Sequence, residues 1–148
     1  MMNILPVFLL AVGALGQPQE TVFSYIKNLQ LCMQWGSNIF VKHLVEEKLA
    51  QKLQVWLDAW RSSGYTIQAK PLEIKVVKQR MWKDRAEVVT KERWTYRYIY
   101  LKTGEEALSP QLIDYEILYK LRKVNDGWKI SAIKILKEVK YGCDRNCE

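Results

Sequence analysis

The sequence predicts an α+β domain in which two or more N-terminal helices pack on a curved, mainly antiparallel four-stranded sheet. Two observations predict this class. Apolar residues recur every three or four positions up to about residue 61, which is the repeat of a helix face. After Gly64 the period changes to two, the repeat of a β-strand. The chain of 148 residues has no internal repeat or linker, so we expect one domain.

The first helix is expected to begin at Pro18, because proline suits the first helical position and Glu20 lies near the positive end of the helix dipole. The sequence Gly36-Ser37-Asn38 ends this helix, and Ser37 or Asn38 caps the next one. The apolar face of the first helix consists of Val22, Tyr25, Ile26, Leu29 and Met33.

A second helix is expected from Ile39 to Arg61, where Ser62-Ser63-Gly64 ends it. Its apolar stripe includes Leu44, Leu49, Leu53, Trp56, Leu57 and Trp60. His43 lies three and four residues before Glu46 and Glu47 on this helix. The three side chains form either a general base with its orienting carboxylate or, as we favour, a solvated surface ion pair.

Four strands follow, and they are separated by turn signals. Lys83-Asp84-Arg85 marks the first turn, residues 103–110 form a loop, and Asn125-Asp126-Gly127 marks a tight turn. The expected strands cover residues 72–77, about 86–101, 113–122 and 128 to about 136.

The first 16 residues have an apolar run from Ile4 to Val12 that is shorter than the roughly 20 residues a membrane-spanning helix needs. They are expected to be a signal peptide or a short N-terminal anchor, with a buried first helix as the alternative. The domain is expected to cover residues 17–140. The protein is therefore expected to be secreted or extracytoplasmic, or tethered to a membrane by its N-terminus.

The cysteines agree with export. Residues 141–148 form a tail in which Cys143 and Cys147 are spaced to form a small disulfide loop in an oxidising compartment. Cys32 is expected to be a small buried hydrophobic residue. A single histidine and no second cysteine pair leave no expected metal site, and no cofactor motif is present.

The charge balance is strongly basic, with 23 Lys and Arg residues against 16 Asp and Glu residues and a net charge of +7. Basic residues alternate outward on neighbouring expected strands, and this favours an acidic protein or an anionic envelope component as the partner. The alternative is a solubilising surface. Nucleic acid is disfavoured, because the aromatic residues fall on the opposite face of each strand. The expected basic face consists of Lys91, Arg93, Arg97, Lys120 and Arg122.

The inward positions of the strands are rich in aromatic residues. The chain has eight Tyr and three Phe, and buried Tyr hydroxyls need partners, so this face forms either a core or a pocket for a small ligand. The candidate pocket residues are Trp56, Trp60, Trp94, Tyr96, Tyr98, Tyr115 and Tyr119.

Two carboxylates are candidates for acid–base chemistry in such a pocket. Glu92 is in phase with Trp94 and Tyr96, and Asp58 lies between Leu57 and Trp60. Burial among aromatic rings would raise the pKa of either carboxyl, and Tyr96 or Tyr98 could then donate a hydrogen bond to a developing oxyanion. Alternatively, Asp58 lies on the solvent side of its helix and Glu92 is out of phase or beyond the helix cover.

The chain resembles the nuclear-transport-factor-2-like superfamily. The resemblance rests on the order of its elements and on the ending Tyr119-Lys120-Leu121-Arg122-Lys123-Val124-Asn125-Asp126-Gly127-Trp128-Lys129-Ile130. The segment from His43-Leu44-Val45 to Leu53-Gln54-Val55-Trp56 is similar to one subgroup, the intermembrane-space domain of chloroplast-division proteins and its bacterial exported relatives. The resemblance implies a cone-shaped domain with a cavity between sheet and helices, used by some relatives for catalysis and by others for binding.

The function that we favour from the sequence is a non-enzymatic binding or assembly module, exported or tethered to a membrane, and monomeric or weakly dimeric. Its working surfaces would be the aromatic pocket and the basic face. The first alternative is a cavity enzyme of the isomerase or dehydratase kind that uses Glu92 or Asp58 with tyrosines. The second alternative is a carrier of a small apolar ligand.

Overall fold

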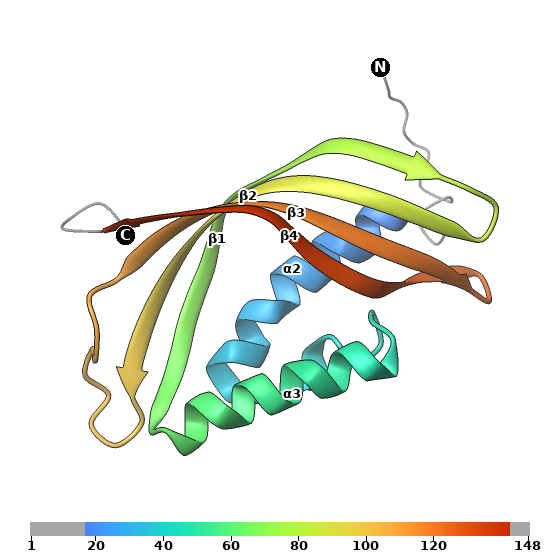
Figure 1. Ribbon diagram of the computed structural model, residues 1–148. Helices are drawn as coiled ribbons and strands as arrows, with labels where there is room; N and C mark the ends of the chain where they lie inside the picture. The colour runs from blue at the N-terminus through green and yellow to red at the C-terminus, as the bar shows by residue number, and fades with distance from the viewer. Residues whose placement is uncertain (1–16, 143–148) are drawn as a thin grey trace.

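The computed structural model describes residues 17–142, which form two helices and a short 3-10 helix packed against one face of a four-stranded antiparallel sheet (Figure 1). The strands follow one another in the order β1-β2-β3-β4. This architecture confirms the predicted α+β class. The elements are α2 (Pro18–Trp35), η2 (Asn38–Phe40), α3 (Glu47–Ser62), β1 (Tyr65–Met81), β2 (Arg85–Tyr100), β3 (Gln111–Val124) and β4 (Gly127–Gly142).

Helix α2 has the bounds that its sequence predicts. Pro18 occupies its first turn, and Gly36 ends it in the left-handed region with φ of 71°. The Gly36 N–H donates a hydrogen bond of 2.7 Å to the carbonyl oxygen of Cys32. Cys32 itself is fully buried in the core with a free thiol, as expected for a small hydrophobic residue.

Helix α3 begins at Glu47, eight residues later than predicted. The segment before it is bonded to the start of β4, because the Ile130 N–H donates to the Leu44 oxygen and the Glu46 N–H donates to the Ile130 oxygen, each at 2.9 Å. Backbone groups used in this way are not available for a helix. The expected helical pairing of His43 with Glu46 and Glu47 is therefore wrong, since His43 is exposed in a turn outside the helix.

The strands are longer than predicted. The first begins at Tyr65 and the last ends at Gly142, so the fold includes two residues that the sequence assigned to the tail. Register shifts mark bulges at Leu72 and Val77 in β1, and others occur in β4. Such bulges bend and twist a sheet, which suits its curvature around the helices. Residues 1–16, Cys143 and Cys147 lie outside the described residues.

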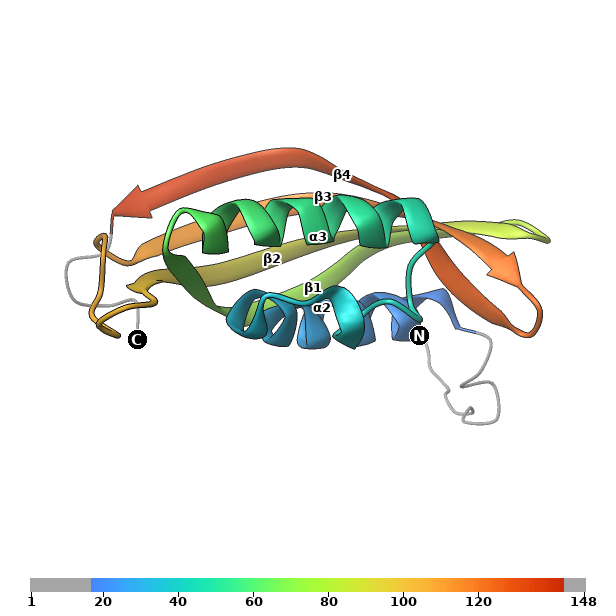
Figure 2. The same cartoon turned by 90° about the horizontal axis from the view of Figure 1, so that it is seen from below.

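The inner face of the sheet, defined as the face toward the helices, holds the hydrophobic core. In Figure 2 both helices lie in front of this face. Leu57 of α3 is buried against it, and the ring of Trp60 stacks on that of Tyr98 with centroids 5.0 Å apart. Residues of β2 alternate, so that Val88, Thr90, Glu92, Trp94 and Tyr96 are buried on this face.

Candidate functional site

Glu92 is a carboxylate buried in the core, and only 3% of it is exposed. Strand β2 places it on the inner face between Thr90 and Trp94, in the predicted phase. Its Oε1 accepts a hydrogen bond of 2.8 Å from the Trp94 indole. Its Oε2 accepts two bonds of 2.6 Å, from the hydroxyls of Thr90 and Tyr119. Both oxygens therefore have donors from neighbouring side chains.

The tyrosines around Glu92 are held in their protonated form. Burial raises the pKa of Tyr119 well above its usual value, and the nearby Glu92 charge and hydrogen bond raise it further. Burial also raises the pKa of Tyr25 and of Tyr96, and the hydroxyl of Tyr96 lies 3.1 Å from that of Tyr115. The Tyr119 hydroxyl is therefore a donor to Glu92 rather than a base. The arrangement is that of a polar core whose hydrogen bonds are satisfied.

The other predicted pocket residues lie in different environments. Trp94, Tyr96 and Tyr119 are buried in the core cluster, and Trp60, Tyr98 and Tyr115 are half-buried against it. Trp56 is 42% exposed and touches only the edge of this group, through the ring of Trp60. The structure thus brings six of the seven rings together as core packing.

Asp58 lies away from the aromatic residues. It is exposed on α3 and accepts a hydrogen bond of 2.9 Å from the Gln54 side chain, four residues earlier on the same helix. The exposed face of α3 also carries Val55, so Asp58 shares the solvent side of this helix. Of the two candidate carboxylates, only Glu92 reaches the inner face.

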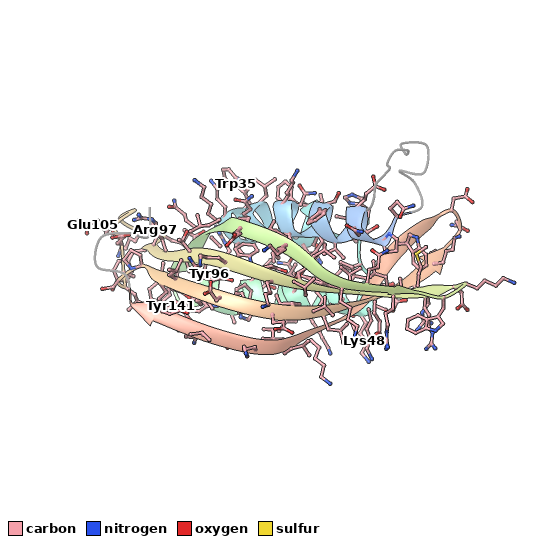
Figure 3. All side chains as sticks on the ribbon, turned by 90° about the horizontal axis from the view of Figure 1, so that it is seen from above. Trp35, Lys48, Tyr96, Arg97, Glu105 and Tyr141 are labelled. Carbon is pink, nitrogen blue, oxygen red and sulfur yellow. The ribbon has the colours of Figure 1, made fainter. Side chains whose placement is uncertain are left out.

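The outer face of the sheet, opposite the helices, has no helix over it and lies toward the viewer in Figure 3. The strand register places the predicted basic residues together on this face. In the described strands it carries thirteen basic and four acidic residues between positions 70 and 137. The basic residues are Lys70, Lys75, Lys78, Arg80, Arg85, Lys91, Arg93, Arg97, Lys120, Arg122, Lys129, Lys134 and Lys137, and the acidic residues are Glu73, Glu87, Asp114 and Glu116.

Some of these charges are paired. Arg93 binds Asp114 through two hydrogen bonds of 2.7 and 2.9 Å, which lower the pKa of Asp114. Arg97 forms an ion pair with Glu106 from the loop after β2. Pairing of this kind orients individual side chains but leaves the face with a large excess of positive charge.

The register also places like charges directly opposite one another. Lys75 of β1 faces Lys91 of β2, and Arg85 of β2 faces Arg122 of β3. Directly opposed like charges destabilise a sheet. A depression of about 310 Å³ spans the four strands, and its charged lining is mixed. The lining residues include Lys75, Lys91, Arg93, Lys137, Glu73, Glu92, Asp114 and Glu116. The opposed pairs and this depression depend on a register that sequence periodicity alone does not provide.

The tip of the β1–β2 hairpin was not among the candidate sites expected from the sequence. Trp82 lies there close to two guanidinium groups, with the Arg85 group 4.7 Å and the Arg80 group 5.4 Å from the centroid of its ring. The local sequence Arg80-Met81-Trp82-Lys83-Asp84-Arg85 contains the signal, which is an exposed tryptophan flanked by basic residues at a turn.

Within residues 17–142, no helix is long and apolar enough to cross a membrane. In the same part of the chain, no three His, Cys, Asp or Glu side chains are grouped as ligands for a metal ion.

Comparison of the fold with solved structures finds the intermembrane-space region of the chloroplast protein ARC6. The match has a TM-score of 0.68 and covers 80% of this chain and 92% of that chain, at 14% sequence identity. The two domains share one fold. A second match is a putative calcium/calmodulin-dependent protein kinase type II association domain from Thiobacillus denitrificans. Its TM-score is 0.47 and its identity 9%, over 81% of this chain and 94% of that one.

No family model matches the sequence, and no curated protein is similar to it in sequence. The likeness to the ARC6 domain confirms the fold expected from the closing hairpin and the helix before the sheet. It carries no site residue across, because few residues are shared at this identity.

Proposed function

We propose that this protein is an exported, non-enzymatic binding module whose outer sheet face holds an acidic partner protein. The observation that carries the proposal is the charge of that face. It holds thirteen basic residues and only four acidic ones, in a chain whose net charge is +7. The remainder of the chain is therefore slightly acidic, and the positive charge is concentrated on one side. Such a field attracts an acidic partner and orients it as it approaches.

The two opposed like-charge pairs support this reading. The register opposition of Lys75 to Lys91 and of Arg85 to Arg122 is unfavourable in the free protein. For the second pair it is partly offset by the Glu46 carboxylate, 3.5 Å from the Arg122 guanidinium. An anionic group placed between the members of either pair would relieve the repulsion. Departures from local stability rules are expected at sites that serve function rather than folding.

The inner face supports binding rather than catalysis. Glu92 is the candidate acid–base group that reaches the aromatic residues, but it is 3% exposed and three donors occupy its oxygens. A general base has to reach the proton that it removes, directly or through one water molecule. Because Glu92 serves to stabilise the core, we propose the outer face as the surface that binds the partner.

Binding of a fluorescent poly-L-glutamate peptide tests the proposal. The variant Lys75→Ser/Lys91→Ser should bind the peptide about threefold to tenfold more weakly than the unmodified chain, since two exposed charge contacts are lost. The binding of both proteins should weaken as salt is added. Fluorescence anisotropy provides the dissociation constants.

The matched control is Lys48→Ser/Lys52→Ser, which removes the same charge from the exposed side of α3. Its affinity should stay close to that of the unmodified chain. An equal loss of affinity in both variants would mean that net charge alone attracts the peptide, and the assignment of the outer face would then fail.

A further inference from the structure

The two hairpins at one end of the fold carry a basic and aromatic surface. We name as the hairpin end residues 78–87 and 120–129, which include the β1–β2 and β3–β4 turns. The two turns are joined by a hydrogen bond of 2.9 Å from the Lys123 N–H to the Asp84 oxygen. In Figure 1 both hairpins project beyond the helices.

The charge of the hairpin end is high for its size. Its twenty residues include eight basic and three acidic side chains, a net charge of +5 within a chain of net charge +7. All of the basic residues except Lys129 are exposed. A hollow of about 260 Å³ on this end is lined by Arg85, Lys120 and Arg122, together with Asp84 and Glu87.

The tip of the β1–β2 hairpin also exposes apolar surface. Met81 is 52% exposed and Trp82 is 39% exposed. The indole of Trp82 is held by the guanidinium groups of Arg80 and Arg85, so it is fixed at the tip beside positive charge. Tryptophan combined with basic side chains is typical of protein surfaces that sit at the boundary between lipid and water.

Helix α2 begins at this same end of the fold. The helix begins at Pro18, and its Thr21 hydroxyl donates a hydrogen bond of 3.3 Å to the carbonyl oxygen of Trp128, the second residue of strand β4. Sixteen residues without a charged side chain precede Gln17, and they include the apolar run from Ile4 to Val12. An apolar segment that enters a membrane at this point would bring the hairpin end to the lipid surface.

We propose that the hairpin end docks on a membrane surface containing anionic phospholipids. The basic side chains bind the phosphate groups, and Trp82 and Met81 enter the interface between headgroups and acyl chains. The central outer face around Lys75 and Lys91 lies outside the hairpin end and then stays open to a partner. The hairpin end shares six basic residues with the outer face, namely Lys78, Arg80, Arg85, Lys120, Arg122 and Lys129. The docking proposal does not rest on the proposed function, because it depends on the two turns, on Trp82 and on Met81 rather than on the central outer face.

Vesicle sedimentation of the full chain tests the docking. The probes are vesicles of phosphatidylcholine alone and vesicles of phosphatidylcholine with phosphatidylglycerol. The readout is the ratio of the two partition coefficients, because the apolar N-terminal run would add binding that does not depend on lipid charge. Lys83→Ser/Lys123→Ser should lower this ratio about fivefold for each basic side chain removed.

The control variant is Lys102→Ser/Lys140→Ser, which removes two exposed lysines from the opposite end of the sheet. Its ratio should remain within about twofold of that of the unmodified chain. Equal losses in the two variants would overturn the proposal, since they would show attraction by net charge without docking at one end. An unchanged ratio in Lys83→Ser/Lys123→Ser would overturn it as well.

Tryptophan fluorescence separates docking into lipid from binding to a soluble anion. Addition of the anionic vesicles should shift the emission of the full chain to shorter wavelength, and the shift should be much smaller in Trp82→Phe. Poly-L-glutamate should produce no such shift at Trp82. If Trp82→Phe shows the same shift as the unmodified chain, then the hairpin tip does not enter the interface and the proposal fails.

Discussion

At the scale of single residues, Glu92 shows why a carboxylate is present in an aromatic core. The Trp94 indole and the Thr90 and Tyr119 hydroxyls all point at it, and each of these donors would be unsatisfied in its absence. Among the described residues that are not exposed, no buried side-chain nitrogen or oxygen lacks a hydrogen-bond partner. Glu92 is thus the acceptor that allows three polar groups to be buried at once.

Removing this acceptor should destabilise the protein. Glu92→Ala is expected to lower the free energy of unfolding by roughly 2 to 4 kcal/mol, because three buried donors lose their partner. Glu92→Gln should cost only about 1 to 2 kcal/mol, because its amide oxygen still accepts the Trp94 bond and the hydroxyls can rotate. Urea denaturation provides both values. A loss below about 0.5 kcal/mol for Glu92→Ala, as for an ordinary surface substitution, would contradict the structural role.

At the scale of elements, helix α3 covers the sheet with one face and leaves the other in solvent. Leu57 is 2% exposed, and Val55, two positions earlier, is 69% exposed. This contrast shows that the side of α3 carrying Leu57 packs on the aromatic residues and that the side carrying Val55 faces solvent. The stack of Trp60 on Tyr98 lies on the same packed side.

Truncation of the two side chains should therefore have very different effects. Leu57→Ala should lower the free energy of unfolding by about 2 to 4 kcal/mol, through lost burial and the cavity left behind. Val55→Ala on the same helix should change it by less than about 0.5 kcal/mol. Thermal or urea unfolding of both variants provides the two changes in the free energy of unfolding. Similar values for both variants would show that α3 does not pack on the sheet through Leu57.

The sequence predicted those features of the fold that depend on local periodicity and local turn residues. The bounds of α2, the turn before Arg85 and the inward phase of Glu92 all follow from local pattern. The start of α3 did not, because the bonds between Leu44, Glu46 and Ile130 join segments more than eighty residues apart. Whether Asp58 faces the core or solvent was ambiguous for a related reason. The elements that pack against a helix determine which of its sides is buried.

At the scale of the whole molecule, the fold divides its surface by charge. The helices and the aromatic face form the core, and the sheet presents a continuous basic face on its other side. The sequence identifies the basic residues, but it does not show which of them lie opposite one another on neighbouring strands. The pairing of Arg85 with Arg122 depends on how the loop between β2 and β3 sets the register. Concentrated charge of this kind is the property on which partner binding depends.

The most direct test of this account follows the backbone amides of the full chain by two-dimensional NMR as poly-L-glutamate is added. We predict that the largest chemical-shift changes fall on the central outer face, at Lys75, Lys91 and their strand neighbours, with little change along α2 and α3. Changes concentrated on the two helices, with the outer face silent, would contradict the account.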